Sequence, residues 1–159
     1  MKITVIAVGK IKEKYFNGAI EEYVKRLGRY CRPEIMEVAD EKPPDGAGES
    51  LELQIKRKEG ERILQKLPEN AFVVALDIDG KALDSEELAA QMERWNVNGI
   101  SHLVFLIGGS LGLAPEVLAR ADYRLSFSRM TFPHQLMRVI LLEQIYRSFR
   151  IRNHEPYHK

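Results

Sequence analysis

Five apolar, β-branched runs alternate with segments of helical periodicity along this chain of 159 residues. The apolar runs predict buried strands at 3–8, 34–38, 72–76, 102–107 and 123–126. The segments between them predict helices at 16–27, 51–67, 84–95, 115–120 and 133–150. Strands that alternate with helices in this way indicate an α/β fold with a mostly parallel, doubly wound sheet. We expect a single domain over residues 1–159, because neither a repeat nor a linker interrupts the pattern.

Turn and cap signals mark the limits of these elements. An acidic turn is expected at 77–80, directly after the third strand. Asp84 and Glu87 have the spacing of a capping box, which marks the start of the third helix. Gly60 predicts a weak point in the second helix, and Pro133 fits the first turn of the last helix.

The last predicted helix is apolar around nearly its whole circumference. Its apolar residues are Leu136, Met137, Val139, Ile140, Leu141, Leu142, Ile145, Tyr146 and Phe149. A helix of this kind must be buried on all sides, but a small sheet covers only one side of it. We therefore expect the other side to pack on a second subunit, which predicts a homodimer.

Two polar residues share one face near the start of this helix, because His134 and Arg138 lie four positions apart. An arginine at this end opposes the helix dipole, and it stands among apolar residues. Arg138 therefore needs an anion beside it. That anion is either the carboxylate of a structural Asp or Glu, or a carboxylate or phosphate of a ligand.

Composition and termini exclude several classes of protein. The longest apolar stretches, near 103–107 and 139–142, are too short to span a bilayer. The N-terminus lacks the cleavage pattern of a signal peptide. These features predict a cytoplasmic protein with no membrane partner.

Neither a disulfide nor a metal site is expected. Cys31 is the single cysteine, so an internal disulfide and a cysteine-based zinc site are excluded. His154 and His158 are four residues apart, but Pro156 between them disfavours a shared helical face. No third ligand accompanies this histidine pair, so we expect no bound metal.

Three loops at the predicted carboxyl ends of strands are candidate ligand sites, because ligands of open α/β sheets bind there. They are the loop after Leu76, the pair Gly108-Gly109 and the segment 127–132. Ordinary turn chemistry accounts equally well for any one of these loops taken alone. The GxGxxG, Walker A and GxSxG motifs are absent, which disfavours dinucleotide-binding enzymes, P-loop NTPases and α/β-hydrolases.

The formal net charge is only +1, but the charge is unevenly distributed. Residues 1–32 and 120–159 each hold eight Lys/Arg and three Asp/Glu, whereas the acidic residues concentrate between them. Basic ends gathered on one face would attract a polyanion such as a nucleic acid. Solvated helix faces with no partner explain the charge equally well.

Two long motifs carry a family resemblance. LVFLIGGSLG at 103–112 precedes LSFSRMTFPHQLMRVILLEQIYR at 125–147, and the chain ends in EPYHK. Together with the opening ITVIAVGKIKEKY and with VALDIDGK at 74–81, this pattern resembles the RlmH family of SPOUT methyltransferases. The resemblance extends across the whole chain, and the two longer motifs are specific in order and spacing.

The resemblance implies a fold and an activity. Members of that family are homodimers whose C-terminal part forms a trefoil knot, an exception to unknotted topology. They use S-adenosylmethionine (SAM) to methylate N3 of a pseudouridine in 23S ribosomal RNA of the large subunit, and they act on the assembled ribosome. The same activity is therefore expected here, with SAM as cofactor and ribosomal RNA as partner.

The resemblance also implies site residues. The cofactor contacts of the family fall on three parts of this sequence: Leu76, Gly108, and the run Phe127, Ser128, Arg129, Met130, Thr131 and Phe132. A side chain at Gly108 is expected to enter the adenosine part of the site. The imide proton of pseudouridine must be taken or shared during transfer, and the candidates are His134, Arg138, Tyr157 and His158. We expect Tyr157 and His158 to complete the site of the partner subunit.

Two other functions fit the same features. A ribosome-binding or assembly protein would use the same fold and leave the SAM pocket unused, although the three loops match the family's pattern. A SPOUT methyltransferase for transfer RNA is the second alternative. The short chain has no appended RNA-binding domain, which favours the ribosomal substrate.

Overall fold

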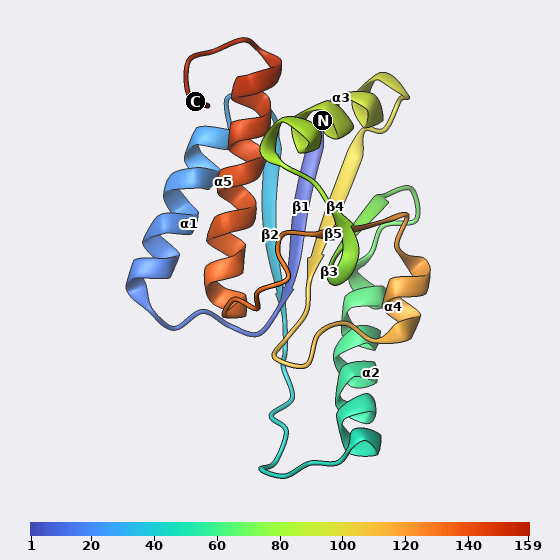
Figure 1. Ribbon diagram of the computed structural model, residues 1–159. Coiled ribbons are helices and arrows are strands. Elements are labelled where there is room, and N and C mark those ends of the chain that lie inside the picture. Colours follow the sequence, from blue (N-terminus) through green and yellow to red (C-terminus); the bar gives the residue numbers. More distant parts are fainter.

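The computed structural model describes all residues from Met1 to Lys159. Its centre is one sheet of five strands in the order β2-β1-β4-β3-β5, and every neighbouring pair is parallel (Figure 1). The strands are β1 (Lys2–Val8), β2 (Arg32–Val38), β3 (Phe72–Ala82), β4 (His102–Ile107) and β5 (Tyr123–Ser126). The predicted parallel sheet is thus confirmed.

Helices cover both faces of this sheet, as a doubly wound sheet requires. They are α1 (Lys14–Leu27), α2 (Glu49–Lys66), α3 (Ser85–Val97), α4 (Pro115–Arg120) and α5 (His134–Arg152). Helix α5 packs between α1 and α3 on one face, and α2 packs against α4 on the other (Figure 1). No helix is both long and apolar enough to cross a membrane.

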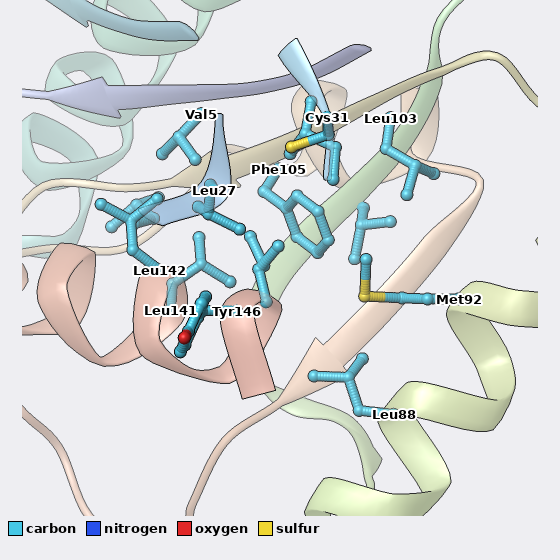
Figure 2. Close-up of a cluster of buried hydrophobic side chains, with 14 of the residues drawn as sticks. Val5, Leu27, Cys31, Leu88, Met92, Leu103, Phe105, Leu141, Leu142 and Tyr146 are labelled. Carbon is cyan, nitrogen blue, oxygen red and sulfur yellow. The ribbon is translucent and has the colours of Figure 1, made fainter. Parts of the chain in front are cut away.

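Side chains along each strand alternate between the two faces of the sheet, so one strand contributes to the cores under both helical layers. On β4, Leu103, Phe105 and Ile107 point to the layer of α1, α3 and α5, whereas Val104 and Leu106 point to the layer of α2 and α4. Figure 2 shows the first cluster, in which Phe105 from the sheet lies among side chains of α1, α3 and α5.

Cys31 lies in the cluster shown in Figure 2 and is buried. Burial raises the pKa of its thiol to about 11. A thiol that stays protonated at neutral pH is a poor nucleophile, so this cysteine contributes to packing.

The capping box at the start of α3 is confirmed. The Asp84 side chain accepts a hydrogen bond from the Glu87 amide at 2.7 Å, and the Glu87 side chain accepts one from the Asp84 amide at 2.9 Å. Pro133 lies one residue outside its expected place. It is the N-cap of α5, with an extended ψ of 136°, and the first helical residue is His134.

The expected acidic turn at 77–80 was wrong. Strand β3 continues through this segment to Ala82, and the register with β5 shifts between Leu76 and Lys81. The bulge at this shift takes up the extra residues while Lys81 pairs with Leu125. A side chain at Gly80 would lie 2.7 Å from the Arg124 carbonyl carbon, so the close approach of β3 to β5 requires glycine.

Gly60 is a packing site and not the expected weak point of α2. The helix runs unbroken from Glu49 to Lys66, and Gly60 is buried. A Cβ atom at Gly60 would lie 2.9 Å from Val117 Cγ2 and 3.3 Å from Ala114 Cβ. The missing side chain therefore lets α4 approach α2 closely.

Candidate functional site

The bulged segment of β3 that begins at Leu76, the glycine loop after β4 and the segment after β5 meet in one pocket of about 450 Å³. This volume lies in the range of natural small-molecule sites. Seven of the eight expected cofactor-binding residues line the pocket: Leu76, Gly108, Phe127, Ser128, Met130, Thr131 and Phe132. Sequence reasoning therefore selected loops that the fold brings together.

Arg129 is the expected cofactor residue that does not line the pocket. Its neighbours fix the local backbone, because the Met130 amide donates a hydrogen bond of 2.9 Å to Ser128 Oγ. The Met130 side chain is 75% exposed, although it borders the pocket. The rim of the pocket is thus formed by a tight turn that presents side chains to solvent.

Gly108 lines the pocket, but a side chain there would meet the protein backbone first. A Cβ atom there would lie 2.7 Å from the carbonyl carbon of Gly112 and would not extend into open pocket space. Gly112 itself has a φ of +88°, a backbone conformation that residues other than glycine rarely adopt. The two glycines let the loop fold back on itself, so a substitution at Gly108 would distort the loop.

Polar residues of the pocket that sequence reasoning did not select come mainly from the bulged part of β3. Asp77 and Asp79 both line the pocket, and the Asp77 side chain is 14% exposed. Arg124 lies 3.8 Å from Asp77 and orients its carboxylate. Asp77 and Asp79 follow directly after an apolar run, and this position could have marked them as pocket residues. Taken alone, however, the acidic segment predicts a turn.

His134 is the one catalytic candidate that lines the pocket. A Cβ atom on Gly9 would lie 3.5 Å from His134 Nε2, so the imidazole packs against the end of β1. Burial lowers the pKa of His134, the Arg138 cation lowers it further, and Asp40 opposes both. The imidazole is therefore neutral at pH 7 and able to accept a proton.

Arg138 is buried beneath the pocket and its guanidinium is already paired. Only 1% of the residue is exposed. Its Nη1 donates a hydrogen bond of 2.6 Å to Glu37 Oε2, and its Nη2 donates to the carbonyl oxygens of Val8 (3.3 Å) and Gly9 (2.7 Å). Of the two anions left open above, the structure supplies the structural carboxylate.

Tyr157 and His158 lie at the other end of α5. The Tyr157 hydroxyl donates a hydrogen bond of 3.1 Å to Glu143 Oε2, and Arg147 Nη1 donates one of 3.0 Å to His158 Nδ1. Since a helix rises about 1.5 Å per residue, Arg147 is roughly 20 Å from His134. One chain therefore does not bring the tail to its own pocket.

The tail also lacks helical structure, because α5 ends at Arg152. His154 occupies a left-handed turn with φ of 55°, so His154 and His158 do not share a helical face. Burial, together with the neighbouring Glu143 carboxylate, raises the pKa of Tyr157 to about 12. In this arrangement the phenol is a hydrogen-bond donor and not a base.

Glu59 is a buried carboxylate behind the pocket that sequence reasoning missed. It is 4% exposed, and its Oε2 accepts a hydrogen bond of 3.0 Å from the Glu41 amide, while Oε1 has no hydrogen-bond partner. A Cβ on Gly109 would lie 3.1 Å from Oε1. Glu59 thus bridges the loop after β2 to the glycine loop after β4.

Glu59→Gln is expected to make stability less sensitive to pH. Burial raises the pKa of Glu59 above its ordinary value near 4.5, with Asp40 adding to the effect. The folded state therefore binds this proton more tightly than the unfolded state, and the resulting stability is lost as pH rises through the folded pKa. Urea titrations should show the variant gaining on the wild type between about pH 4.5 and pH 7. A constant difference in unfolding free energy over that range would contradict the assignment.

Comparison with known proteins agrees with this geometry. A family model described as "Predicted SPOUT methyltransferase" matches residues 1–158. Proteins named "Ribosomal RNA large subunit methyltransferase H" from Bifidobacterium animalis subsp. lactis and Bifidobacterium adolescentis are 62% and 64% identical over 159 residues. The protein of that name from Clostridium beijerinckii is 60% identical. All three alignments cover 100% of both chains.

A solved structure is similar in fold. A probable methylase family protein from Haemophilus influenzae Rd KW20 superposes with a TM-score of 0.54 at 12% identity, covering 99% of this chain and 70% of that one. Such low identity supports the fold alone. The full-length match to the family model and the relatives near 60% identity show more: the chain belongs to the SPOUT methyltransferase family and, within it, to the RlmH family.

Proposed function

We propose that this protein methylates N3 of a pseudouridine in 23S ribosomal RNA, with SAM as methyl donor. Methylation of large-subunit ribosomal RNA follows from relatives that are about 60% identical over their full length and carry that activity in their name. The observation that carries the proposal is the single pocket formed by the three strand-end loops. The nucleotide and the atom rest on the resemblance of the motifs. A ribosomal substrate also favours the cytoplasm.

The residues of the pocket fit SAM. Leu76, Phe127 and Phe132 offer apolar contacts to an adenine ring, and the backbone of the glycine loop is open to close approach. Asp77 and Asp79 offer acceptors for ribose hydroxyls or an ammonium group. When bound, SAM supplies a methyl group on a positively charged sulfur. The protein has to hold that group in line with the attacking nitrogen and exclude water.

Thr131→Trp is expected to reduce SAM affinity more than tenfold. Thr131 lines the pocket and is exposed, so an indole there would occupy pocket space without disturbing the core. Calorimetric titration with SAM measures the loss. Ser50→Trp, on the exposed surface of α2, is the matched control and should bind SAM normally. Undiminished affinity in folded Thr131→Trp would refute this placement of the cofactor.

His134 is the proposed general base. Its neutral imidazole lines the pocket, and an imide proton can pass to it as the N3–C bond forms. Arg138 acts behind it as a positioning residue, because its guanidinium holds the carbonyl oxygens of Val8 and Gly9 against the start of α5. Its cation also keeps the imidazole neutral.

A homodimer and the knotted C-terminal part belong to the same proposal. Several apolar residues of α5 remain only partly buried in the single chain: Leu136, Met137, Val139, Ile140 and Ile151. Beside them, Ile140, Phe127 and Phe132 line a second groove of about 310 Å³ between α3 and α5. An obligate interface over this surface would resemble a core cut in half. Light scattering should therefore give the mass of two chains at micromolar concentration.

The activity is tested with ribosomes from cells that lack the enzyme. Methyl groups from labelled SAM should appear in large-subunit RNA, and digestion should locate them on a pseudouridine. Assembled ribosomes should be methylated much faster than protein-free RNA, because so small a chain has little surface with which to read a stem-loop alone. The assembly-protein alternative predicts ribosome binding with no transfer of label.

A further inference from the structure

A basic–aromatic patch lies at the end of the sheet opposite the cofactor pocket. It comprises Lys25, Arg26, Arg29, Tyr30, Tyr146 and Arg150, which together with Glu22 surround a hollow of about 270 Å³. Four of these side chains are cationic, and they come from the last turns of α1 and α5 and from the turn that leads into β2. None of them belongs to the site described above.

Aromatic rings hold the guanidinium groups of the patch in place. Arg26 lies over Tyr23 and Tyr146, with Cζ 5.5 and 5.7 Å from the ring centroids. Arg29 lies 5.5 Å from the Tyr30 ring, and Arg150 lies 5.8 Å from the Tyr146 ring. Such cation–π contacts restrain the cations before any ligand arrives, which lowers the entropy lost on binding.

Two carboxylates neutralise only part of this charge. Glu22 pairs with Arg26 at 3.0 Å, and Glu155 lies 2.9 Å from Arg150 and 3.9 Å from Arg29. Lys25 forms no ion pair and is exposed, and the Arg29 side chain is 72% exposed. The patch therefore keeps an excess of positive charge at Lys25 and Arg29.

The patch is joined to the C-terminal tail. Arg150 Nη2 donates a hydrogen bond of 3.0 Å to the Pro156 carbonyl, and the Tyr30 hydroxyl donates one of 2.9 Å to Glu155 Oε1. Tyr157 follows directly and packs on Tyr146. The patch and the tail are therefore held together, so the patch lies beside any pocket that the tail completes.

We infer that this patch binds the phosphate backbone of the substrate RNA next to the nucleotide to be methylated. The inference rests on the proposed function, since an RNA must reach the pocket that the tail completes. Restrained guanidinium groups and a free lysine are features with which proteins track the backbone of an RNA strand. The patch holds the RNA by charge and leaves the choice of base to the pocket.

The test is Lys25→Gln/Arg29→Gln, which removes the unpaired Lys25 and the exposed Arg29, whose carboxylate partner Glu155 lies 3.9 Å away. Affinity for ribosomal particles should fall roughly tenfold, and the slope of log affinity against log salt should fall by about 2. The matched control, Lys58→Gln/Lys66→Gln, removes the same charge from the exposed face of α2 and should keep the wild-type slope. SAM affinity, dimer mass and the turnover rate at saturating ribosome concentration should not change.

Three outcomes would overturn the inference. The first is an unchanged salt slope in the double variant, and the second is an equal loss in the control. The third is a loss seen with whole particles but not with RNA extracted from them, because the patch would then contact a ribosomal protein. Failure of the proposed function itself is recognised separately, since the wild type would then bind ribosomes without transferring methyl groups.

Discussion

Arg138→Met should lower the free energy of unfolding by about 3 kcal/mol, because removal of one partner from a buried ion pair leaves the other uncompensated. Methionine has similar length and fills the space of the apolar stem. It leaves the Gly9 carbonyl and the Glu37 carboxylate without their donor. The Glu37 side chain is 38% exposed, so water can solvate its carboxylate in the variant. The expected loss in unfolding free energy is therefore at the lower end of the range for broken buried ion pairs.

Thermal unfolding measures this loss as a decrease in Tm of roughly 6–12 °C for a chain of this size. Arg57→Met is the matched control. Arg57 pairs with Glu116 at a similar distance, 2.8 Å, but both side chains are about half exposed, so its loss should cost less than about 1 kcal/mol. If Arg138 instead acted on the substrate directly, its variant would be as stable as the wild type and only slow in methyl transfer.

For Arg138, the sequence predicts that a partner is needed but not which partner it is. The need for an anion follows from one charged residue in an apolar helix, and it can be read from that helix alone. Its partner, Glu37, stands 101 positions earlier, at the end of a strand whose neighbours are set by the sheet order. Two groups so far apart in sequence meet only through tertiary packing, so the sequence could not exclude either a structural partner or a ligand as the partner of Arg138.

The strands and helices were predictable because their signals are local. A period of two in β4 and the capping box at Asp84 depend on residues a few positions apart. The extension of β3 to Ala82 depends on pairing with β5, in which Lys81 and Ala82 pair with Leu125 and Ser126, 44 positions further along the chain. An acidic Asp-Ile-Asp-Gly segment taken alone looks like a turn.

The candidate site likewise has a part that could be predicted from the sequence and a part that could not. Loops at strand ends converge because parallel strands bring their carboxyl ends to one edge, so the pocket followed from the fold class. Glu59 has no such signal. It occupies the middle of a polar helix, and only the packing of the glycine loop against that helix buries it.

Deletion of residues 156–159 should reduce methyl transfer by orders of magnitude while SAM binding and the dimer persist. Tyr157 and His158 are the catalytic candidates that lie far from the pocket of their own chain, held against Glu143 and Arg147. The deletion removes the Tyr157 ring from Tyr146 and the hydrogen bonds of the tail to Glu143, Arg147 and Arg150, but none of these residues lines the pocket. Single-turnover methylation of ribosomes measures the defect, and calorimetry with SAM supplies the control. Full activity of the truncated protein would show that the tail is a dispensable end.

Mixed dimers then decide which pocket the tail serves. One subunit lacks 156–159 and the other carries Thr131→Trp, so each homodimer is inactive. If the tail crosses to the partner, the truncated subunit still has an intact pocket, and the tail of the Thr131→Trp subunit completes it. Up to one of the two active sites in each mixed dimer then regains activity. If each tail served its own chain, no pocket in the mixed dimer would have both parts, and activity would stay absent. Because α5 separates tail and pocket by roughly 20 Å within one chain, we expect activity to return.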